Sequence, residues 1–189
     1  TETSTFNKTY RSTTINSLTL GNGSGTTSPT LNFAYDALAG SGDPLIIDDS
    51  SLVVNSGATI THSAAPDSST IAGRINIDVQ TGNATIYSGG FISANTKGYY
   101  ANGPGCVRFA GAGYGGYSGR YYDGSIGTPY GGAYEPTTLG SGCNGFNATS
   151  TYGGGTIKLN IGGTLTIDGT VTSNGNGSAY TGASARGAD

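Results

Sequence analysis

Neighbouring carboxylates are the first residues in this sequence that could do chemistry. Asp48 and Asp49 follow the apolar run 45–47, and Asp78 lies in a later strand-like pattern. Paired carboxylates act as acid and base in polysaccharide-cleaving enzymes. Adjacent residues of a strand point to opposite faces, so Asp48 and Asp49 could share a site only at a strand end. We interpret the pair as a solvated turn and expect no catalytic residue in the chain.

His62 is the only histidine, and it lies among Thr and Ser residues just beyond Ile60. No Ser-His-Asp spacing accompanies it, so we expect an exposed polar residue. A metal site would have to be built from carboxylates, which favour Ca²⁺ with backbone carbonyl oxygens as further ligands. No calcium-binding loop motif occurs, and no resident cofactor is expected. The weak calcium candidates are Asp43, Asp48, Asp49 and Asp78.

Two cysteines, Cys106 and Cys143, lie in a stretch rich in Gly and Tyr. In a chain poor in Lys and without Met, such a pair favours a disulfide and an oxidising compartment. The alternative is two free buried thiols. The sequence therefore predicts an extracellular or cell-surface protein.

Five Asn-X-Ser/Thr sequons would permit glycosylation in a suitable host. A chain this rich in Asn, Ser and Thr produces most of that number by chance, so the motifs alone assign no modified residue. The sequon residues are Asn7, Asn22, Asn83, Asn147 and Asn176.

The composition excludes several classes of protein. The 189 residues include 35 Gly and 13 Tyr, but only 8 Lys and Arg and 11 Asp and Glu, for a net charge of −3. Eight basic residues cannot coat a phosphate backbone, so nucleic acid is not an expected partner. No apolar run approaches the length of a membrane span. A helical bundle would need far more Ala, Leu, Glu and Lys. A chain poor in both apolar and charged residues fits a repetitive, β-rich protein.

Two blocks of the chain alternate apolar and polar residues with the period of a β-strand. They span residues 44–95 and 157–175, and Gly, Asn and Ser turns divide each into short strands. Residues 1–43 form a Thr/Ser/Gly-rich segment with one clear alternation at 17–20. No window has helical periodicity, so we expect an all-β domain.

The two blocks can be laid over one another as a repeat of about twenty residues, which is the length of one coil of a parallel β-helix. Residues 52–60 resemble the second half of the same unit. The aligned positions are residues 73–79 with 155–161, residues 84–87 with 165–168, Ile92 with Val171, and Asn95 with Asn174.

Residues 96–156, between the blocks, hold 18 of the glycines and nine of the tyrosines. Gly lets backbones approach closely, and Tyr offers a large ring with a polar tip. The stretch is therefore expected to make close contacts within the fold, between subunits or with glycans. The candidate contact residues are Tyr99, Tyr100, Tyr114, Tyr117, Tyr121, Tyr122, Tyr130 and Tyr134.

Residues 153–175 resemble the glycine-rich repeats of large secreted and cell-surface, adhesin-like proteins. In these a Gly/Tyr-rich stretch precedes a Gly-Gly-Gly-X-Ile-X-Leu strand. The resemblance covers roughly residues 50–180 and implies a right-handed parallel β-helix without a catalytic signature. We expect a short solenoid over 44–189, carrying the Gly/Tyr-rich insertion at 96–156.

These observations favour an extracellular structural protein that assembles with copies of itself into a filament, sheath or surface layer. Residues 1–43 could then act as an arm that adds a strand to a neighbour. The alternative is an adhesin or carbohydrate-binding segment of a larger surface protein. A polysaccharide-active enzyme that uses Asp48, Asp49 or Asp78 is the least favoured interpretation.

Overall fold

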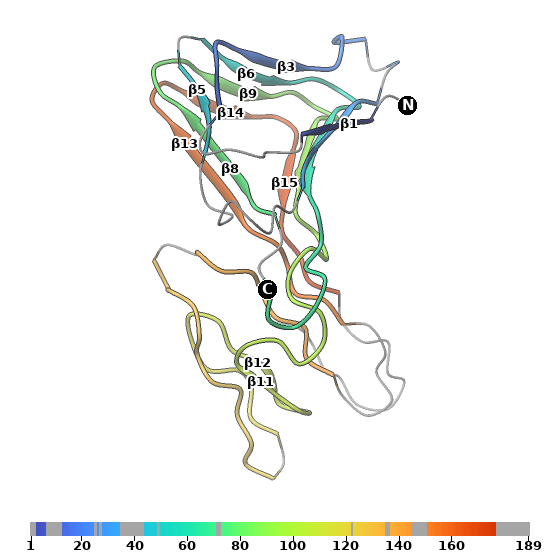
Figure 1. Cartoon of the computed structure of the whole chain (residues 1–189), viewed down its shortest axis with the longest axis vertical. Coiled ribbons are helices and arrows are strands. Elements are labelled where there is room, and N and C mark those ends of the chain that lie inside the picture. The colour runs from blue at the N-terminus through green and yellow to red at the C-terminus, as the bar shows by residue number, and fades with distance from the viewer. Residues whose placement is uncertain are drawn as a thin grey trace. The chain divides into compact units, whose positions relative to one another are not determined.

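The computed structural model describes residues 3–6, 13–24, 26, 28–34, 44–48, 50–70, 73–121, 123–134, 137–144 and 151–176. Every regular element in this part of the chain is a β-strand (Figure 1). The chain forms two compact units, which are described separately below. The first comprises Thr1–Ser63, Gly73–Ser93 and Ile157–Thr172, and the second comprises Ala64–Ala72, Ala94–Thr156 and Ser173–Asp189.

Three all-parallel sheets form the first unit, and we call them sheets I, II and III. Sheet I contains β2 (Thr13–Ile15), β5 (Leu45–Ile47), β8 (Ile75–Val79) and β13 (Ile157–Ile161). Sheet II contains β3 (Leu18–Leu20), β6 (Leu52–Val54), β9 (Ala84–Ile86) and β14 (Leu165–Ile167). Sheet III contains β1 (Thr3–Phe6), β4 (Thr30–Phe33), β7 (Thr59–His62), β10 (Phe91–Ser93) and β15 (Thr170–Thr172).

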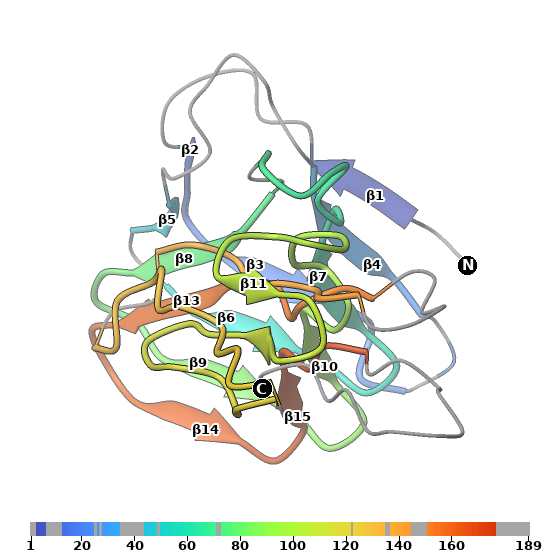
Figure 2. The same ribbon diagram turned by 90° about the horizontal axis from the view of Figure 1, so that it is seen from below.

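The chain passes through sheets I, II and III in turn, and each passage adds one coil to a parallel β-helix. Figure 2 shows the strands of each sheet side by side in this order, from β2 to β13 and from β3 to β14. The all-β parallel β-helix with its Gly/Tyr-rich insertion is confirmed. The described strands of residues 1–43 belong to it, because β2, β3 and β4 pair with β5, β6 and β7.

The aligned repeat is also confirmed, because aligned residues are neighbours in adjacent coils. Ile75 pairs with Ile157, Ala84 with Leu165, and Ile92 with Val171. Along each strand, alternation turns every second side chain inward. The inward aliphatic side chains of successive coils stack on one another as ladders. The large, fully buried ladder residues are Ile47, Leu52, Val54, Ile60, Ile75, Ile77, Val79, Ile86 and Ile92.

Glycines let the turns between sheets I and II stack closely. A Cβ atom on Gly82 would lie 1.6 Å from the carbonyl oxygen of Ser50, and one on Gly162 would lie 1.8 Å from that of Gln80. Since these oxygens belong to the turn of the preceding coil, a side chain at either position would push the coils apart.

His62 contradicts the expectation of an exposed residue, because it is 0 % exposed. Strand β7 extends as far as His62, and alternation from Ile60 turns its ring inward beside Phe33 of the preceding coil. Its Nδ1 lies 2.8 Å from the carbonyl oxygen of Ser63, so the buried ring has a polar partner. The prediction was wrong because the polar neighbours of His62 concealed the last inward position of the strand.

Candidate functional site

The last coil, formed by β13, β14 and β15, leaves part of its aliphatic ladder uncovered. Leu165 and Ile167 are 41 % and 49 % exposed, whereas Ala84 and Ile86, their neighbours in the preceding coil, are 0 % exposed. Each of the three strands lies at an edge of its sheet, and Figure 2 shows β14 at the lower edge of the drawing. Within the described part of the chain, this coil therefore presents both apolar side chains and an unpaired strand edge.

The opposite end of the β-helix carries the complementary edges. Strands β2 and β3 end sheets I and II, and Leu18 and Leu20 continue the ladders of Leu52 and Val54 in register. Sheet III extends one strand further, because β1 pairs with β4 from Thr3 opposite Thr30 to Phe6 opposite Phe33. The two ends thus differ by one strand in sheet III.

Glycine-to-glycine backbone contacts organise the second unit. Gly98 donates its N–H to the oxygen of Gly153 at 2.8 Å, and Gly140 donates to that of Gly154 at 2.9 Å. A Cβ atom on Gly98 would lie 2.3 Å from the oxygens of both Gly140 and Gly154. Three segments of the insertion therefore meet at distances that only glycine permits.

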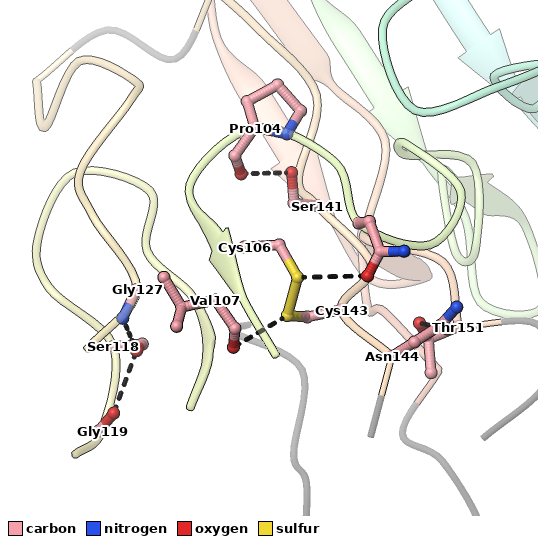
Figure 3. The surroundings of a disulfide bond; sticks show 11 residues. Pro104, Cys106, Val107, Ser118, Gly119, Gly127, Ser141, Cys143, Asn144 and Thr151 are labelled. Carbon is pink, nitrogen blue, oxygen red and sulfur yellow. Dashed lines mark hydrogen bonds between the residues drawn. A yellow bond between two sulfur atoms is a disulfide. The ribbon is translucent and has the colours of Figure 1, made fainter. Parts of the chain in front are cut away.

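The predicted disulfide between Cys106 and Cys143 is confirmed, with Cα atoms 5.3 Å apart (Figure 3). Cys106 belongs to β11 (Cys106–Val107), which forms a short antiparallel pair with β12 (Gly111–Ala112). Beside the bridge, the Ser141 hydroxyl donates to the oxygen of Pro104 at 2.7 Å (Figure 3). The bond indicates an oxidising environment, as secreted and surface proteins encounter.

Three of the candidate tyrosines pack inside the second unit. Tyr99 is buried with Ala65 and Leu139, and Tyr130 packs against this cluster. Tyr130 meets Tyr114 edge to face at 5.0 Å between ring centroids. The Tyr130 hydroxyl donates to the oxygen of Leu139 at 2.8 Å, and burial raises the pKa of Tyr130 to about 12.

The other candidate tyrosines lie nearer the surface or pair with aromatic neighbours. Tyr100 packs against Tyr152, and Tyr121 stacks on Phe109 at 5.1 Å. Tyr117 and Tyr134 are 73 % and 102 % exposed, the highest values among the large apolar side chains of the described residues. Tyr122 lies outside the described residues.

The carboxylate candidates do not come together in the part of the chain that the structure describes. Asp48 is exposed, and Asp78 accepts a hydrogen bond from the Asn160 amide at 2.7 Å. Asp43 and Asp49 lie outside the described residues. Among the residues described, no three His, Cys, Asp or Glu side chains are grouped to hold a metal ion.

Asp67 is a turn residue that the sequence analysis did not single out. Its Oδ1 accepts the backbone N–H groups of Ser69 at 2.8 Å and Thr70 at 2.6 Å, and its Oδ2 accepts the Thr70 hydroxyl. Hydrogen bonds, led by that of the Thr70 hydroxyl, lower the pKa of Asp67 to about 2. The Pro66-Asp67 pair before Ser and Thr residues is the turn signal that could have revealed it.

No helix in the described part of the chain could cross a membrane. No protein-family model, curated protein or solved structure matches the chain. The function is therefore inferred from the fold and from the exposed apolar side chains of the last coil.

Proposed function

We propose that this chain is an extracellular structural protein whose copies join end to end into a filament, sheath or surface layer. The observation that supports this most directly is the last coil, where Leu165 and Ile167 stay exposed in ladders whose two middle coils are fully buried. Full burial of such a side chain stabilises an interface by roughly 1.5–3 kcal/mol.

A second copy is the partner that fits this surface best. Coil-on-coil stacking is the contact that this ladder already makes within the chain, where Ala84 pairs with both Leu52 and Leu165. In the same register, the first coil of a second copy would place Leu18 on Leu165 and Leu20 on Ile167. Parallel edge strands would then gain hydrogen-bond partners along sheets I and II.

Low charge also favours association of identical chains. The chain carries 8 basic and 11 acidic residues, for a net charge of −3. Mutual repulsion between copies is therefore weak, and further screened at physiological ionic strength.

Stacking in this register has a consequence for β1. Strand β15 would pair with β4 of the next copy, on the edge that β1 occupies here. β1 must therefore leave β4 before two copies can join, and in the separate chain it covers that edge of sheet III. Strand addition by the N-terminal segment stays a prediction; the released β1 is the part of the segment that could perform it.

The proposal is tested by placing a charge on the uncovered ladder. We expect Ile167→Asp to raise the protein concentration needed for assembly at least tenfold, since the carboxylate would have to be buried. Thr166→Asp is the matched control, because Thr166 pairs with Thr85 on the outer face of the same strand. Light scattering measures both variants, and circular dichroism checks their folding. Equal assembly of the two variants would contradict the proposal.

The exposed rings of Tyr117 and Tyr134 favour glycan binding as a second candidate function. Exposed aromatic faces can stack on sugar rings. A glycan array with the wild-type chain, Tyr117→Ala and Tyr134→Ala tests this candidate. Tyr87→Ala is the control, because Tyr87 is a half-exposed tyrosine of the first unit. If Tyr87→Ala abolished glycan binding while Tyr117→Ala and Tyr134→Ala retained it, the second unit would have no role in that binding.

A further inference from the structure

Three of the five sequon asparagines lie in the described residues, and they differ in what holds the asparagine amide. Asn22 follows β3, Asn83 precedes β9, and Asn176 follows β15. Asn7 and Asn147 lie outside the described residues. Enzymatic glycosylation of a folded chain requires an amide that the enzyme can reach and a backbone that can move into its active site.

Asn22 has an exposed side chain in the loop between β3 and β4. Its Oδ1 accepts the backbone N–H of Ser24 at 3.1 Å and the Ser24 hydroxyl at 2.6 Å. The sequon's own hydroxyl therefore already contacts the amide group to be modified. The amide nitrogen donates only a long bond, 3.4 Å, to the exposed Thr26 hydroxyl.

The backbone on the C-terminal side of Asn22 has room to move. Gly21, before it, is held, because the Asn55 amide donates to the Gly21 carbonyl oxygen at 2.9 Å. A Cβ atom on Gly23 would meet only Asn55 Oδ1, at 3.8 Å. Glycine adopts many backbone conformations at little steric cost, so the sequon can adapt to an enzyme at Gly23 without disturbing a strand.

Asn83 is exposed as well, but its amide and its backbone are held by the fold. Its Oδ1 accepts the backbone N–H of Thr164 from the next coil at 2.8 Å. The second sequon residue, Ala84, is fully buried and lies at the start of β9, between β6 and β14. An enzyme could bind this sequon only after β9 left sheet II.

Asn176 is likewise held, by hydrogen bonds to Tyr152. Its Oδ1 accepts the N–H of Tyr152 at 2.5 Å, and its own N–H donates to the Tyr152 oxygen at 3.0 Å. Its side chain is partly buried in the second unit.

We infer that Asn22 is an acceptor site for an N-linked glycan in the folded protein. The co-reactant is a lipid-linked oligosaccharide activated as a glycosyl phosphate or diphosphate. The amide nitrogen of Asn22 forms a bond to the anomeric carbon, whose bond to the phosphate oxygen breaks. The lipid phosphate departs with the bonding electrons, and the proton that the nitrogen loses passes to this phosphate or to the solvent. The Ser24 hydroxyl, on Oδ1, stabilises the amide as its nitrogen becomes nucleophilic.

The test uses the folded, disulfide-bonded chain with a purified single-subunit oligosaccharyltransferase that needs no acidic residue before the sequon. A polyprenyl-linked oligosaccharide is the donor, and peptide mapping by mass spectrometry locates the glycan. We expect transfer to Asn22 and at least tenfold less to Asn83. Asn22→Gln and Ser24→Ala should each abolish transfer at that site, whereas Asn83→Gln should leave it unchanged.

Unfolding and reducing the chain provides the second arm, because it frees the Asn83 sequon from its sheet. Transfer to Asn83 should then rise at least tenfold, which shows that the fold and not the local sequence protected it. Absence of transfer to Asn22 in the folded chain would overturn the inference. Equal transfer to Asn22 and Asn83 in the folded chain would overturn it as well.

Discussion

Ala84 and Leu165 occupy the same position in adjacent coils and pair directly, yet Ala84 is 0 % exposed and Leu165 is 41 % exposed. The difference arises because a further coil covers Ala84, whereas β14 ends sheet II. A solenoid buries each coil mainly against its neighbours, so an end coil keeps an apolar face that another coil could cover. This difference in exposure between Ala84 and Leu165 is the reason to expect that a second copy covers the last coil.

Removal of β1 should promote assembly. We expect deletion of residues 1–6 to lower the protein concentration at which particles form, because β4 would then offer a free edge to β15. Replacing residues 3–6 with Gly and Ser, which form strands poorly, should act in the same direction at constant chain length. Light scattering against concentration is the measurement. If either change abolished assembly, β1 would be a strand that copies exchange and not a cover for its own chain.

Close stacking of the turns makes Gly82 sensitive to substitution. Gly82→Ala should lower the free energy of unfolding by about 2 kcal/mol or more, because its Cβ would lie 1.6 Å from the Ser50 oxygen. Gly116→Ala is the control, since a Cβ there meets nothing within 4 Å. Urea unfolding followed by circular dichroism compares the two. Equal stability would mean that the turns do not pack as described.

The disulfide should stabilise the second unit. Replacing Cys106 and Cys143 together by Ser opens a bridge that spans 37 residues of sequence. The chain-entropy cost of closing such a loop corresponds to roughly 3–4 kcal/mol of stability. Calorimetry of the double variant should show a lower melting temperature than the oxidised wild type. An unchanged melting temperature would show that the glycine backbone contacts alone hold the insertion together.

Stability should fall as the solution becomes strongly alkaline. Burial raises the pKa of Tyr130 to about 12 from a usual value of 10.0. Between these values the unfolded chain loses the phenol proton while the folded chain keeps it, so the free energy of unfolding decreases with rising pH. Tyr130→Phe should flatten this part of the pH profile and cost about 1 kcal/mol at neutral pH through the lost hydrogen bond to Leu139. Denaturant titrations from pH 9 to pH 12 check both effects, and an unchanged profile in Tyr130→Phe would assign them to other tyrosines.

Sequence reasoning reached the coil repeat because Ile75 and Ile157 belong to strands whose alternation is plain in the residues themselves. The burial of His62 could not be predicted, because its inward position depends on how far β7 extends. The arrangement of the second unit could not be predicted either, since Gly98, Gly140 and Gly153 have no side chains whose spacing could reveal a pattern. The exposure of Leu165 could not be predicted either, because a ladder residue looks the same in a middle coil and in an end coil.

Electron microscopy of the purified native protein, after light scattering of the same fractions, tests the central claim most directly. Sheets I and II contain four strands each, so one copy contributes four coils to a stack in this register. With about 4.8 Å per coil, we predict filaments or layers with an axial subunit repeat of roughly 19 Å. A monomer of 18.8 kDa at every concentration, or an assembly whose repeat is unrelated to this length, would contradict end-to-end stacking.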